Sequence, residues 1–263
     1  MKNSILTTFN KDGYEKYGHK MLSSFDSLWP LDIDIYAYYE GEISFHQYSK
    51  RIHLLKLLKH CPKLVEFKER HKNNPTAHGK IEPKTGFKWD AVRFAHKSYC
   101  ITYASTLIDT DRIFWIDADV ITHSPVPNNF LETVLPSNYY CSFLGREPLF
   151  SETGFVGFNC KHQYHKEFMN QWMDFYNSDK IFMLKEWHDC EVFDTVRRKM
   201  STEKKILAFD LAKDLGIVKG HPFINSILGT YMDHLKGPRK DKGTSHKSDL
   251  KIIRKEKYWQ NVK

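Results

Sequence analysis

The first forty residues alternate between patterns typical of a strand and of a helix. Residues 4–9 are mostly apolar or β-branched and end at a polar turn, 10–13, which is how a buried strand ends. Large apolar side chains then recur at helical spacing between positions 14 and 25, until Trp29 and Pro30 interrupt the pattern. Residues 31–38 alternate apolar and polar side chains, as a strand with one covered face does. The order strand, helix, strand predicts a βαβ unit and a mostly parallel sheet.

The rest of the chain continues this alternation. Residues 45–70 have helical periodicity, and residues 71–87 are polar and rich in Pro and Gly, which predicts a loop. A helix from about Trp89 to Ser105 leads to an apolar strand at 112–116. We expect further strands at 139–144 and 154–158, and further helices at about 162–177 and 188–199.

The organisation of the chain favours one folded domain with a basic tail. There is no internal repeat and no linker rich in Gly or Ser, so we assign residues 1–240 to a single domain and 241–263 to the tail. The last 30 residues contain ten Lys or Arg and three acidic residues, and so carry +7 of the net charge of +8. We expect the segment from about residue 235 onward to be extended or partly disordered. Its partner would be a phosphate-bearing ligand, nucleic acid or an anionic membrane surface.

The composition excludes a disordered chain and a membrane-spanning one. The 263 residues are 41% hydrophobic and 14% aromatic, enough for a full core, and no run of about 18 apolar residues occurs. The five cysteines lie at least 19 residues apart and read as reduced core thiols. The apolar stretch at the N-terminus is too short for a signal peptide. We therefore expect a cytoplasmic protein.

The sequence Asp-x-Asp occurs three times, and one occurrence differs in context. The pair at 32–34 lies in an alternating strand, where a solvated sheet surface explains it, and the pair at 109–111 suits a turn. Asp117 and Asp119 instead follow directly after a buried central strand, at the end where open α/β sheets bind ligands. Two carboxylates spaced in this way can hold Mg²⁺ or Mn²⁺, the alternative being a plain strand-end turn.

The region around this pair resembles a known group of enzymes. The strand 112–116 running into Asp117, Ala118 and Asp119 resembles the DxD region of nucleotide-sugar-dependent glycosyltransferases with the GT-A fold. Residues 234–240 (His-Leu-Lys-Gly-Pro-Arg-Lys) are similar to the H-x-x-G-x-x-K motif of glycosyltransferase family 8, the glycogenin-like enzymes. Asp and Lys follow this motif where that family usually has Pro and Trp.

This resemblance implies a fold and a set of site residues. The fold would be α/β of the GT-A, Rossmann-like type, with a mostly parallel central sheet flanked by helices and the DxD at the carboxyl end of a central strand. His234 would complete the metal shell of Asp117 and Asp119, while the Gly237 backbone and Lys240 would hold the diphosphate. The chemistry is consistent, because a sugar leaves a diphosphate only when the growing negative charge is neutralised.

Five more residues are candidates for binding the donor. The resemblance implies that Thr8, Phe9 and Asn10, at the end of the first strand, hold the nucleotide base and ribose, although a turn explains them equally well. Arg93 and Lys97 are one helical turn apart, so they can present two cations to a diphosphate or donor sugar, the alternative being a solvated helix face.

Three acidic residues are candidates for a catalytic role. Glu152 lies in a segment with two glycines and several aromatic residues, which in the resembled fold lines the donor or acceptor sugar; a glycine-spaced core strand is the alternative. Asp189 begins a predicted helix, where an acidic residue also serves as a cap. The resemblance implies an acidic residue at this point, either as the general base of an inverting enzyme or near the donor sugar of a retaining one, with Asp189 as the first choice and Glu191 as the second.

Together these features predict a metal-dependent glycosyltransferase. It would move a sugar from a nucleotide-diphosphate sugar to an acceptor hydroxyl with Mn²⁺ or Mg²⁺, and the acceptor would be a glycan or lipid-linked glycan. The basic tail would dock peripherally on a membrane surface. One alternative is a phage-type enzyme that glycosylates a hydroxylated base in DNA, reached by base flipping and stacking on tail aromatics. The other is a non-catalytic nucleic-acid-binding protein.

Overall fold

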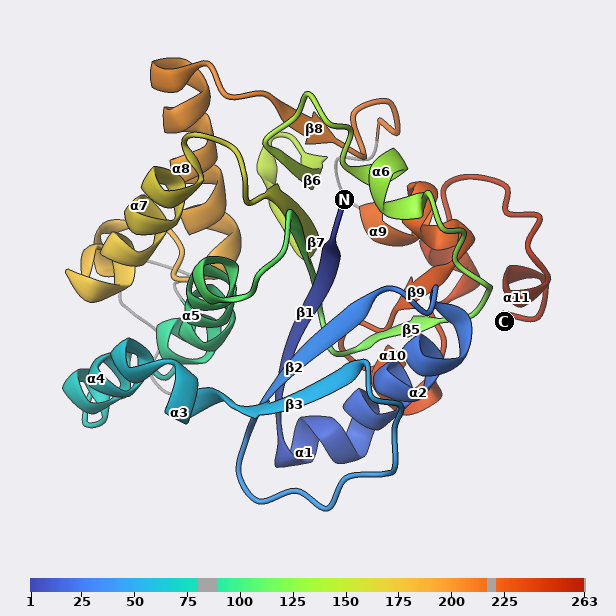
Figure 1. Ribbon diagram of the computed structural model, residues 1–263, viewed down its shortest axis with the longest axis horizontal. Helices are drawn as coiled ribbons and strands as arrows, with labels where there is room; N and C mark the ends of the chain where they lie inside the picture. The colour runs from blue at the N-terminus through green and yellow to red at the C-terminus, as the bar shows by residue number, and fades with distance from the viewer. Residues whose placement is uncertain (80–88, 217–220, 263) are drawn as a thin grey trace.

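The computed structural model describes residues 1–79, 89–216 and 221–262, and a seven-stranded sheet forms their centre (Figure 1). The strand order is β3-β2-β1-β4-β7-β6-β8. In chain order the strands are β1 (Asn3–Asn10), β2 (Asp34–Glu40), β3 (Ile52–Lys56), β4 (Arg112–Ile116), β6 (Cys141–Arg146), β7 (Leu149–Asn159) and β8 (Ala208–Asp210).

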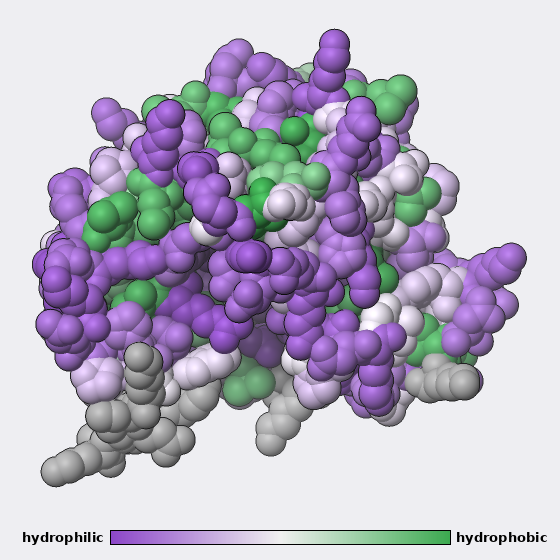
Figure 2. Space-filling view, turned by 90° about the horizontal axis from the view of Figure 1, so that it is seen from below, coloured by the Kyte–Doolittle hydropathy of each residue, from purple (hydrophilic) through white to green (hydrophobic). Residues whose placement is uncertain are grey.

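The sheet is mostly parallel, as the sequence predicts. Strands β1, β2, β3 and β4 pair in parallel, and so do β6 and β8, whereas β7 runs antiparallel to both of its neighbours, β4 and β6. The carboxyl ends of β1, β2 and β4 therefore meet at one edge of the sheet. Figure 2 looks onto the molecule from this side, where polar residues surround a hollow.

Helices cover both faces of the sheet (Figure 1). One face carries α3 (Leu57–His60), α4 (Pro62–His71), α5 (Ala91–Leu107), α7 (His165–Asn177), η2 (Lys180–Met183) and α8 (Asp189–Lys204). The other face carries α1 (Lys11–Gly13), η1 (Tyr14–Gly18), α2 (His19–Leu28), α6 (Phe130–Val134), α9 (Pro222–Asn225) and η3 (Ile227–Thr230). The fold is thus mixed α/β, with helices on both sides of a central sheet.

Strand β4 shows why the sheet needs both layers. Ile113 and Trp115 pack into the core beneath α5 and α7, while Phe114 and Ile116 pack into the core on the opposite face. All four side chains are almost fully buried. Successive side chains of a strand point to opposite faces, so a continuous apolar run requires cover on both.

A second, two-stranded sheet lies beside the end of β4. It pairs β5 (Val120–Thr122) with β9 (Met232–His234) in antiparallel orientation, and Val120 is the direct partner of His234. The pairing brings a segment near the C-terminus next to the Asp-x-Asp turn.

One predicted element is wrong in part. The sequence predicts helix over residues 45–70, but Ile52–Lys56 forms the edge strand β3, parallel to β2, with Ile35 opposite Ile52. Pairing with β2 outweighs the local helical spacing, because strand formation depends on the neighbouring strand more than on intrinsic preference. The helices α3 and α4 follow only after this strand. Of the predicted loop, residues 80–87 lie outside the described residues.

The C-terminal segment is folded, contrary to the expected extended or disordered state. It contains α10 (Arg239–Lys242), η4 (Lys247–Asp249) and α11 (Lys257–Gln260). Trp259 is 2% exposed and donates Nε1–H to the Gly229 carbonyl oxygen at 2.6 Å. Burial of this aromatic side chain outweighs the repulsion among the cations around it, which the charge count alone does not reveal. None of the described helices has both the length and the apolar character needed to cross a bilayer.

Candidate functional site

The turn after β4 presents two carboxylates at the carboxyl edge of the sheet. The Asp117 amide donates to the Gly154 carbonyl oxygen at 3.0 Å, and the Asp117 carbonyl oxygen accepts from the Val120 amide at 3.0 Å. These bonds tie the turn to β7 and start β5. Asp119 is 9% exposed, and its carbonyl oxygen accepts from the Leu235 amide. The predicted strand-end position of the pair is therefore confirmed.

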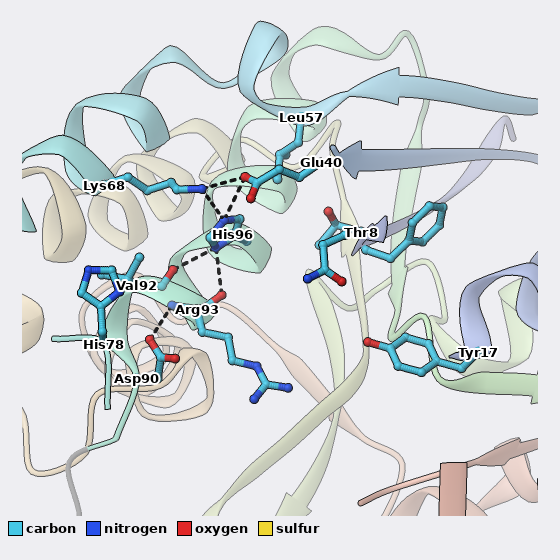
Figure 3. Close-up of a pocket in the computed structure, with 12 residues that line it drawn as sticks. Thr8, Tyr17, Glu40, Leu57, Lys68, His78, Asp90, Val92, Arg93 and His96 are labelled. Atoms are coloured by element: carbon cyan, nitrogen blue, oxygen red, sulfur yellow. Dashed lines mark hydrogen bonds and ion pairs between the residues drawn. The ribbon is translucent and has the colours of Figure 1, made fainter. Parts of the chain in front are cut away.

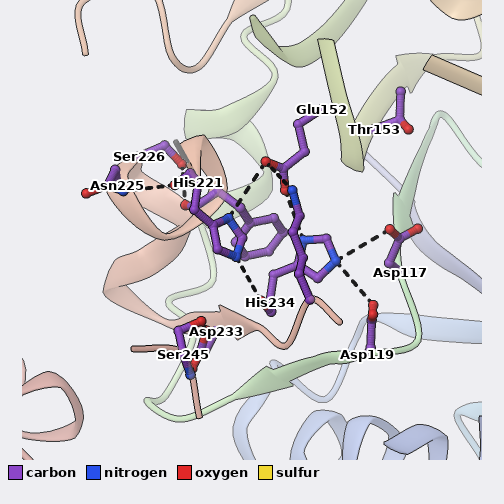
Figure 4. Close-up of polar contacts among 12 residues, drawn as sticks. Asp117, Asp119, Glu152, Thr153, His221, Asn225, Ser226, Asp233, His234 and Ser245 are labelled. Atoms are coloured by element: carbon purple, nitrogen blue, oxygen red, sulfur yellow. Dashed lines mark hydrogen bonds and ion pairs between the residues drawn. The ribbon is translucent and has the colours of Figure 1, made fainter. Parts of the chain in front are cut away.

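The imidazole of His234 meets both carboxylates. Nε2 lies 3.2 Å from Asp119 Oδ1 and 3.6 Å from Asp117 Oδ2 (Figure 4). One ligand atom from each of the three residues lies within 4.8 Å of the others. Two carboxylate oxygens and one imidazole nitrogen form a donor set that suits Mn²⁺, and also Mg²⁺ when water and phosphate oxygens complete the shell.

The other imidazole nitrogen faces a third carboxylate. His234 Nδ1 lies 3.0 Å from Glu152 Oε1, on β7, and both residues are 3% exposed. Lys236 Nζ lies 2.7 Å from Glu152 Oε2, and His221 Nδ1 lies 3.7 Å from the same oxygen. Although burial opposes ionisation, the neighbouring Lys236, His221 and His234 hold the pKa of Glu152 well below its usual range.

Charge around the carboxylate pair is balanced by protein groups alone. Burial lowers the pKa of His234, but Asp119 and Glu152 more than compensate and raise it to about 9. Burial likewise disfavours the Asp119 carboxylate, yet His234 and Lys240 hold the pKa of this group well below its usual value. Without a bound cation, the neighbouring carboxylates therefore favour the protonated form of His234.

Lys240 is the second cation that balances the Asp119 carboxylate, beside His234. Its Nζ lies 2.8 Å from Asp119 Oδ2 and 4.8 Å from the centroid of the Tyr17 ring. Gly237 lies between His234 and Lys240 with φ of 55°, in the left-handed region that glycine adopts without strain. A side chain there would meet no heavy atom within 4 Å, so the backbone requires this glycine and packing does not.

Lys97 is buried between two carboxylates rather than on a solvated helix face. Its Nζ lies 3.0 Å from Asp117 Oδ1 and 3.0 Å from Asp189 Oδ2. Burial disfavours the ammonium, but Asp117 and Asp189 raise the pKa of Lys97 above its usual value. Thr153 Oγ1 donates to Asp189 at 2.5 Å. Burial also disfavours the Asp189 carboxylate, yet Lys97 and Thr153 lower the pKa of this group.

Two adjoining cavities contain most of the predicted site residues. The first has a volume of about 460 Å³ and is lined by Thr8, Phe9, Asn10 and Arg93, among others (Figure 3). The second, of about 530 Å³, is lined by the metal-ligand candidates and by Glu152, Lys97, Asp189, Gly237 and Lys240. Thr8 and Arg93 line both cavities. The structure thus brings twelve of the thirteen predicted residues to one connected region.

Asn10 and Glu191 have local structural partners. The Asn10 side chain accepts from the Gly13 amide at 2.8 Å and caps α1, as the turn alternative predicts. Glu191 is not among the lining residues of either cavity. Its carboxylate accepts from the backbone amides of Lys185 and Glu186, and so holds the loop before α8.

The sequence analysis missed an ion-paired group in the first cavity. Glu40, at the carboxyl end of β2, accepts from Lys68 at 2.7 Å and lies 3.3 Å from His96 Nε2 (Figure 3). The hydrogen bond to His96 lowers the pKa of Glu40 to about 2, with further help from Lys68 and against the effect of burial. The position of Glu40 next to the end of β1 is the signal that could have identified it.

Comparisons with known proteins identify the fold. No protein-family model matches the chain, and no curated protein is significantly similar in sequence. Among solved structures, the galactosyltransferase LgtC in complex with donor and acceptor sugar analogs matches with a TM-score of 0.54 and 10% identity, over 98% of this chain and 99% of that one. This similarity shows that the chain has the GT-A fold, as the sequence analysis expects.

Two further structures match less closely. Mouse xyloside xylosyltransferase 1 matches with a TM-score of 0.46 and 14% identity, over 80% of this chain and 85% of that chain. The glycosyltransferase GlyE of Streptococcus pneumoniae TIGR4 matches with a TM-score of 0.43 and 10% identity, over 80% of this chain and 45% of that chain. The present chain therefore spans less than half the length of GlyE.

Proposed function

We propose that the chain is a metal-dependent glycosyltransferase that moves a sugar from a nucleotide-diphosphate sugar to an acceptor hydroxyl. The observation that carries the proposal is the meeting of Asp117, Asp119 and His234 at the carboxyl edge of the sheet, in a cavity that also contains Lys240. The GT-A fold supports it. Membership of glycosyltransferase family 8 is part of the proposal and rests on the H-x-x-G-x-x-K spacing.

The three proposed ligands fit Mn²⁺ or Mg²⁺. Asp119 and His234 are buried, and isolated charges at such positions are costly. A bound divalent cation would supply charge neutralisation for the departing diphosphate. Binding of a cation requires the Nε2 proton of His234 to leave, because a metal ligand must offer its lone pair.

Lys240 has a second proposed role. A cation bound to Asp119 would weaken the ion pair between Asp119 and Lys240. The Lys240 ammonium could then bind a phosphate oxygen instead. The backbone at Gly237 lines the same cavity and would approach the diphosphate closely. Both roles agree with what the resembled motif implies.

The first cavity is the proposed nucleoside site. Thr8, Phe9 and Asn10 lie at the end of β1, and Arg93 lies between the two cavities, where it would bind phosphate or donor sugar. Glu40 adds a carboxylate at the end of the adjacent strand, and a carboxylate in that place can accept hydrogen bonds from ribose hydroxyls.

Asp189 is the proposed acidic residue beside the donor sugar. Its carboxylate is 2% exposed and ionised, held between Lys97 and Thr153. A carboxylate with a lowered pKa is a poor proton acceptor, so we propose that Asp189 orients the sugar and stabilises positive charge at the reacting carbon. Lys97 and Glu152 line the same cavity.

We propose a glycan or lipid-linked glycan as the acceptor, with the protein cytoplasmic and peripheral at the membrane. The C-terminal segment supports contact with an anionic surface, because Lys251 and Lys255 are exposed and Ile253 between them is 92% exposed. The alternative readings involving nucleic acid are less well supported. They require aromatic tail residues that stack on bases, yet Trp259 is buried and Tyr258 is stacked on His123 with centroids 4.0 Å apart.

A thermal-shift screen of nucleotide sugars tests the proposed function. We expect at least one nucleotide sugar to raise the melting temperature in the presence of Mn²⁺, and the shift to disappear with a chelator. Release of free sugar or nucleoside diphosphate from that compound then identifies the donor. Nucleic-acid affinity without any nucleotide-sugar binding would overturn the proposal in favour of the non-catalytic alternative.

A further inference from the structure

The imidazole of His234 lies between carboxylates on two sides. Nε2 faces Asp119 at 3.2 Å, and Nδ1 faces Glu152 at 3.0 Å (Figure 4). A neutral histidine carries a proton on one nitrogen and a lone pair on the other, and the hydrogen bond made by one nitrogen decides which is free to bind a metal. Glu152 is ionised and can only accept, so it favours the proton on Nδ1.

Several contacts hold Glu152 in place. Its carboxylate is buried, and Lys236 Nζ lies 2.7 Å from Oε2, the oxygen that does not face His234. His221 Nε2 donates to the carbonyl oxygen of His234 itself at 2.8 Å. The side chain and the backbone of His234 are therefore both anchored, and Glu152 cannot turn away without leaving a buried charge unpaired.

Gly154 provides the surface on which the imidazole lies. A Cβ atom at this position would lie 2.5 Å from His234 Cε1 and 2.7 Å from Nδ1. These separations are shorter than atoms in contact allow, so a side chain at residue 154 would displace the ring. The close approach of ring and strand accounts for a glycine two residues after Glu152 on the same face of β7.

We propose that Glu152 is a positioning residue that selects Nε2 of His234 as the metal-binding nitrogen, with Gly154 setting the plane of the ring; this rests on the proposed metal-dependent function. Glu152 was predicted from the sequence to line the donor or acceptor sugar, and here it acts through His234. A cation held by Glu152, His221 and His234 is geometrically conceivable, since their ligand atoms also lie within 4.8 Å of one another. It does not suit the proposed reaction, because all three residues are buried and His221 does not line the cavity where the diphosphate would bind.

Two substitutions of Glu152 separate positioning from packing. Glu152→Gln keeps an oxygen that accepts from Nδ1–H, whereas Glu152→Met keeps the length of the side chain without the acceptor. Lys236 loses its partner in the second variant, but its side chain is 34% exposed and can reach solvent. Asp194→Asn is the matched control, because Asp194 is equally buried, accepts from Ser151 beside Glu152, and lines neither of the two cavities.

The measured quantity is the affinity of the full chain for Mn²⁺ with no nucleotide present. The electron paramagnetic resonance signal of free Mn²⁺ reports it. We expect Glu152→Met to weaken Mn²⁺ binding about 10- to 100-fold, as loss of a metal ligand's hydrogen-bond partner does. Glu152→Gln should retain most of the affinity, and Asp194→Asn should bind like the wild type. Gly154→Ala should weaken binding without altering any ligand atom.

Each outcome is decisive. The positioning role is overturned if Glu152→Met binds Mn²⁺ like the wild type, if Glu152→Gln loses as much as Glu152→Met, or if the wild type binds no Mn²⁺. Failure of the proposed function is a separate result: Mn²⁺ binding would follow the expected order while no nucleotide sugar binds or turns over. If the cation instead used the Nδ1 side, His221→Ala would abolish binding while Asp119→Ala would leave it unchanged.

Discussion

Lys240 and Asp119 form an ion pair with their charged atoms 2.8 Å apart, although 121 positions separate them in the sequence. The pair joins the turn after β4 to α10, and it places a cation at the site where a divalent metal is proposed to bind. The Lys240 ammonium thus balances the buried Asp119 carboxylate when no metal is bound, so we expect the fold to persist without one.

Asp119→Ala should eliminate metal-dependent turnover and leave the fold intact. Donor hydrolysis and sugar transfer should fall by at least about 100-fold, because the variant lacks one of the two proposed carboxylate ligands. Asp109→Ala is the control, since Asp109 belongs to another Asp-x-Asp and its side chain is 89% exposed. Circular dichroism should show both variants folded. Full turnover of Asp119→Ala in excess chelator would contradict a metal-dependent reaction.

Lys240→Met should weaken donor use more than it affects stability. The ammonium is proposed to bind the diphosphate, and a charge-assisted hydrogen bond of this kind accounts for about 10- to 100-fold in kcat/KM. Lys242→Met provides the comparison, because Lys242 belongs to the same short helix and is exposed. Equal kinetic constants for both variants would argue against a phosphate contact for Lys240.

Acid should loosen the C-terminal segment through His123. Burial, with a contribution from Arg254, lowers the pKa of His123 to about 4, against the opposing effects of Asp233 and Glu256. A folded-state pKa below the ordinary 6.5 means that the unfolded chain binds the proton first. The stability that the neutral ring provides is thus complete above pH 6.5 and is lost as the pH falls from 6.5 towards 4.

Urea unfolding between pH 7.5 and 4.5 measures this effect. His123→Phe keeps an aromatic ring beside Tyr258 and removes the titrating group, so its free energy of unfolding should fall less with acid than that of the wild type. Parallel pH profiles for the two proteins would exclude His123 as the source.

Trp259→Ala should destabilise the whole domain. The side chain is 2% exposed and donates to Gly229, so its removal leaves both a cavity and an unsatisfied carbonyl group. We expect a loss of about 3–5 kcal/mol in the free energy of unfolding.

Ile253→Ala, at a position that is 92% exposed, should change the free energy of unfolding by less than about 0.5 kcal/mol but reduce binding to anionic vesicles. A tail that is separate from the domain would show no such difference.

Cys190 should be protected from alkylation by the donor. It is half-buried and lines the second cavity, whereas Cys61, Cys100 and Cys141 are buried. In a Cys160→Ser background, a thiol reagent should label Cys190 quickly, and Mn²⁺ with the donor should slow the labelling about tenfold or more. A rate that does not respond to the donor would place the sugar elsewhere.

The hydrophobic pattern predicted the parts of the fold that depend on local sequence. Strand β4 is an unbroken apolar run, so the position of Asp117 and Asp119 at its end followed from the residues alone. The edge strand β3 could not be recognised in the same way, because its apolar side chains also fit a helix and only pairing with β2 decides between the two.

The candidate site was predictable where a motif marked it and not where tertiary contacts create it. The spacing of His234 and Lys240 located both residues, but the three-residue strands β5 and β9 that deliver His234 carry no recognisable pattern. The partner of Glu152 is 82 positions away, so its contact with His234 is visible only in three dimensions. The burial of Trp259 could not be predicted from the sequence, because charged residues precede it and the segment as a whole is basic.

The pairing of β5 with β9 also determines when the proposed metal ligands come together during synthesis of the chain. When the first 230 residues have been translated, the chain contains every strand of the central sheet and both aspartates of the turn. It does not yet contain His234, the partner of Val120. Domains begin to fold from the N-terminus during synthesis. The proposed metal site is therefore completed only when the residues of β9 have been translated and have paired with β5.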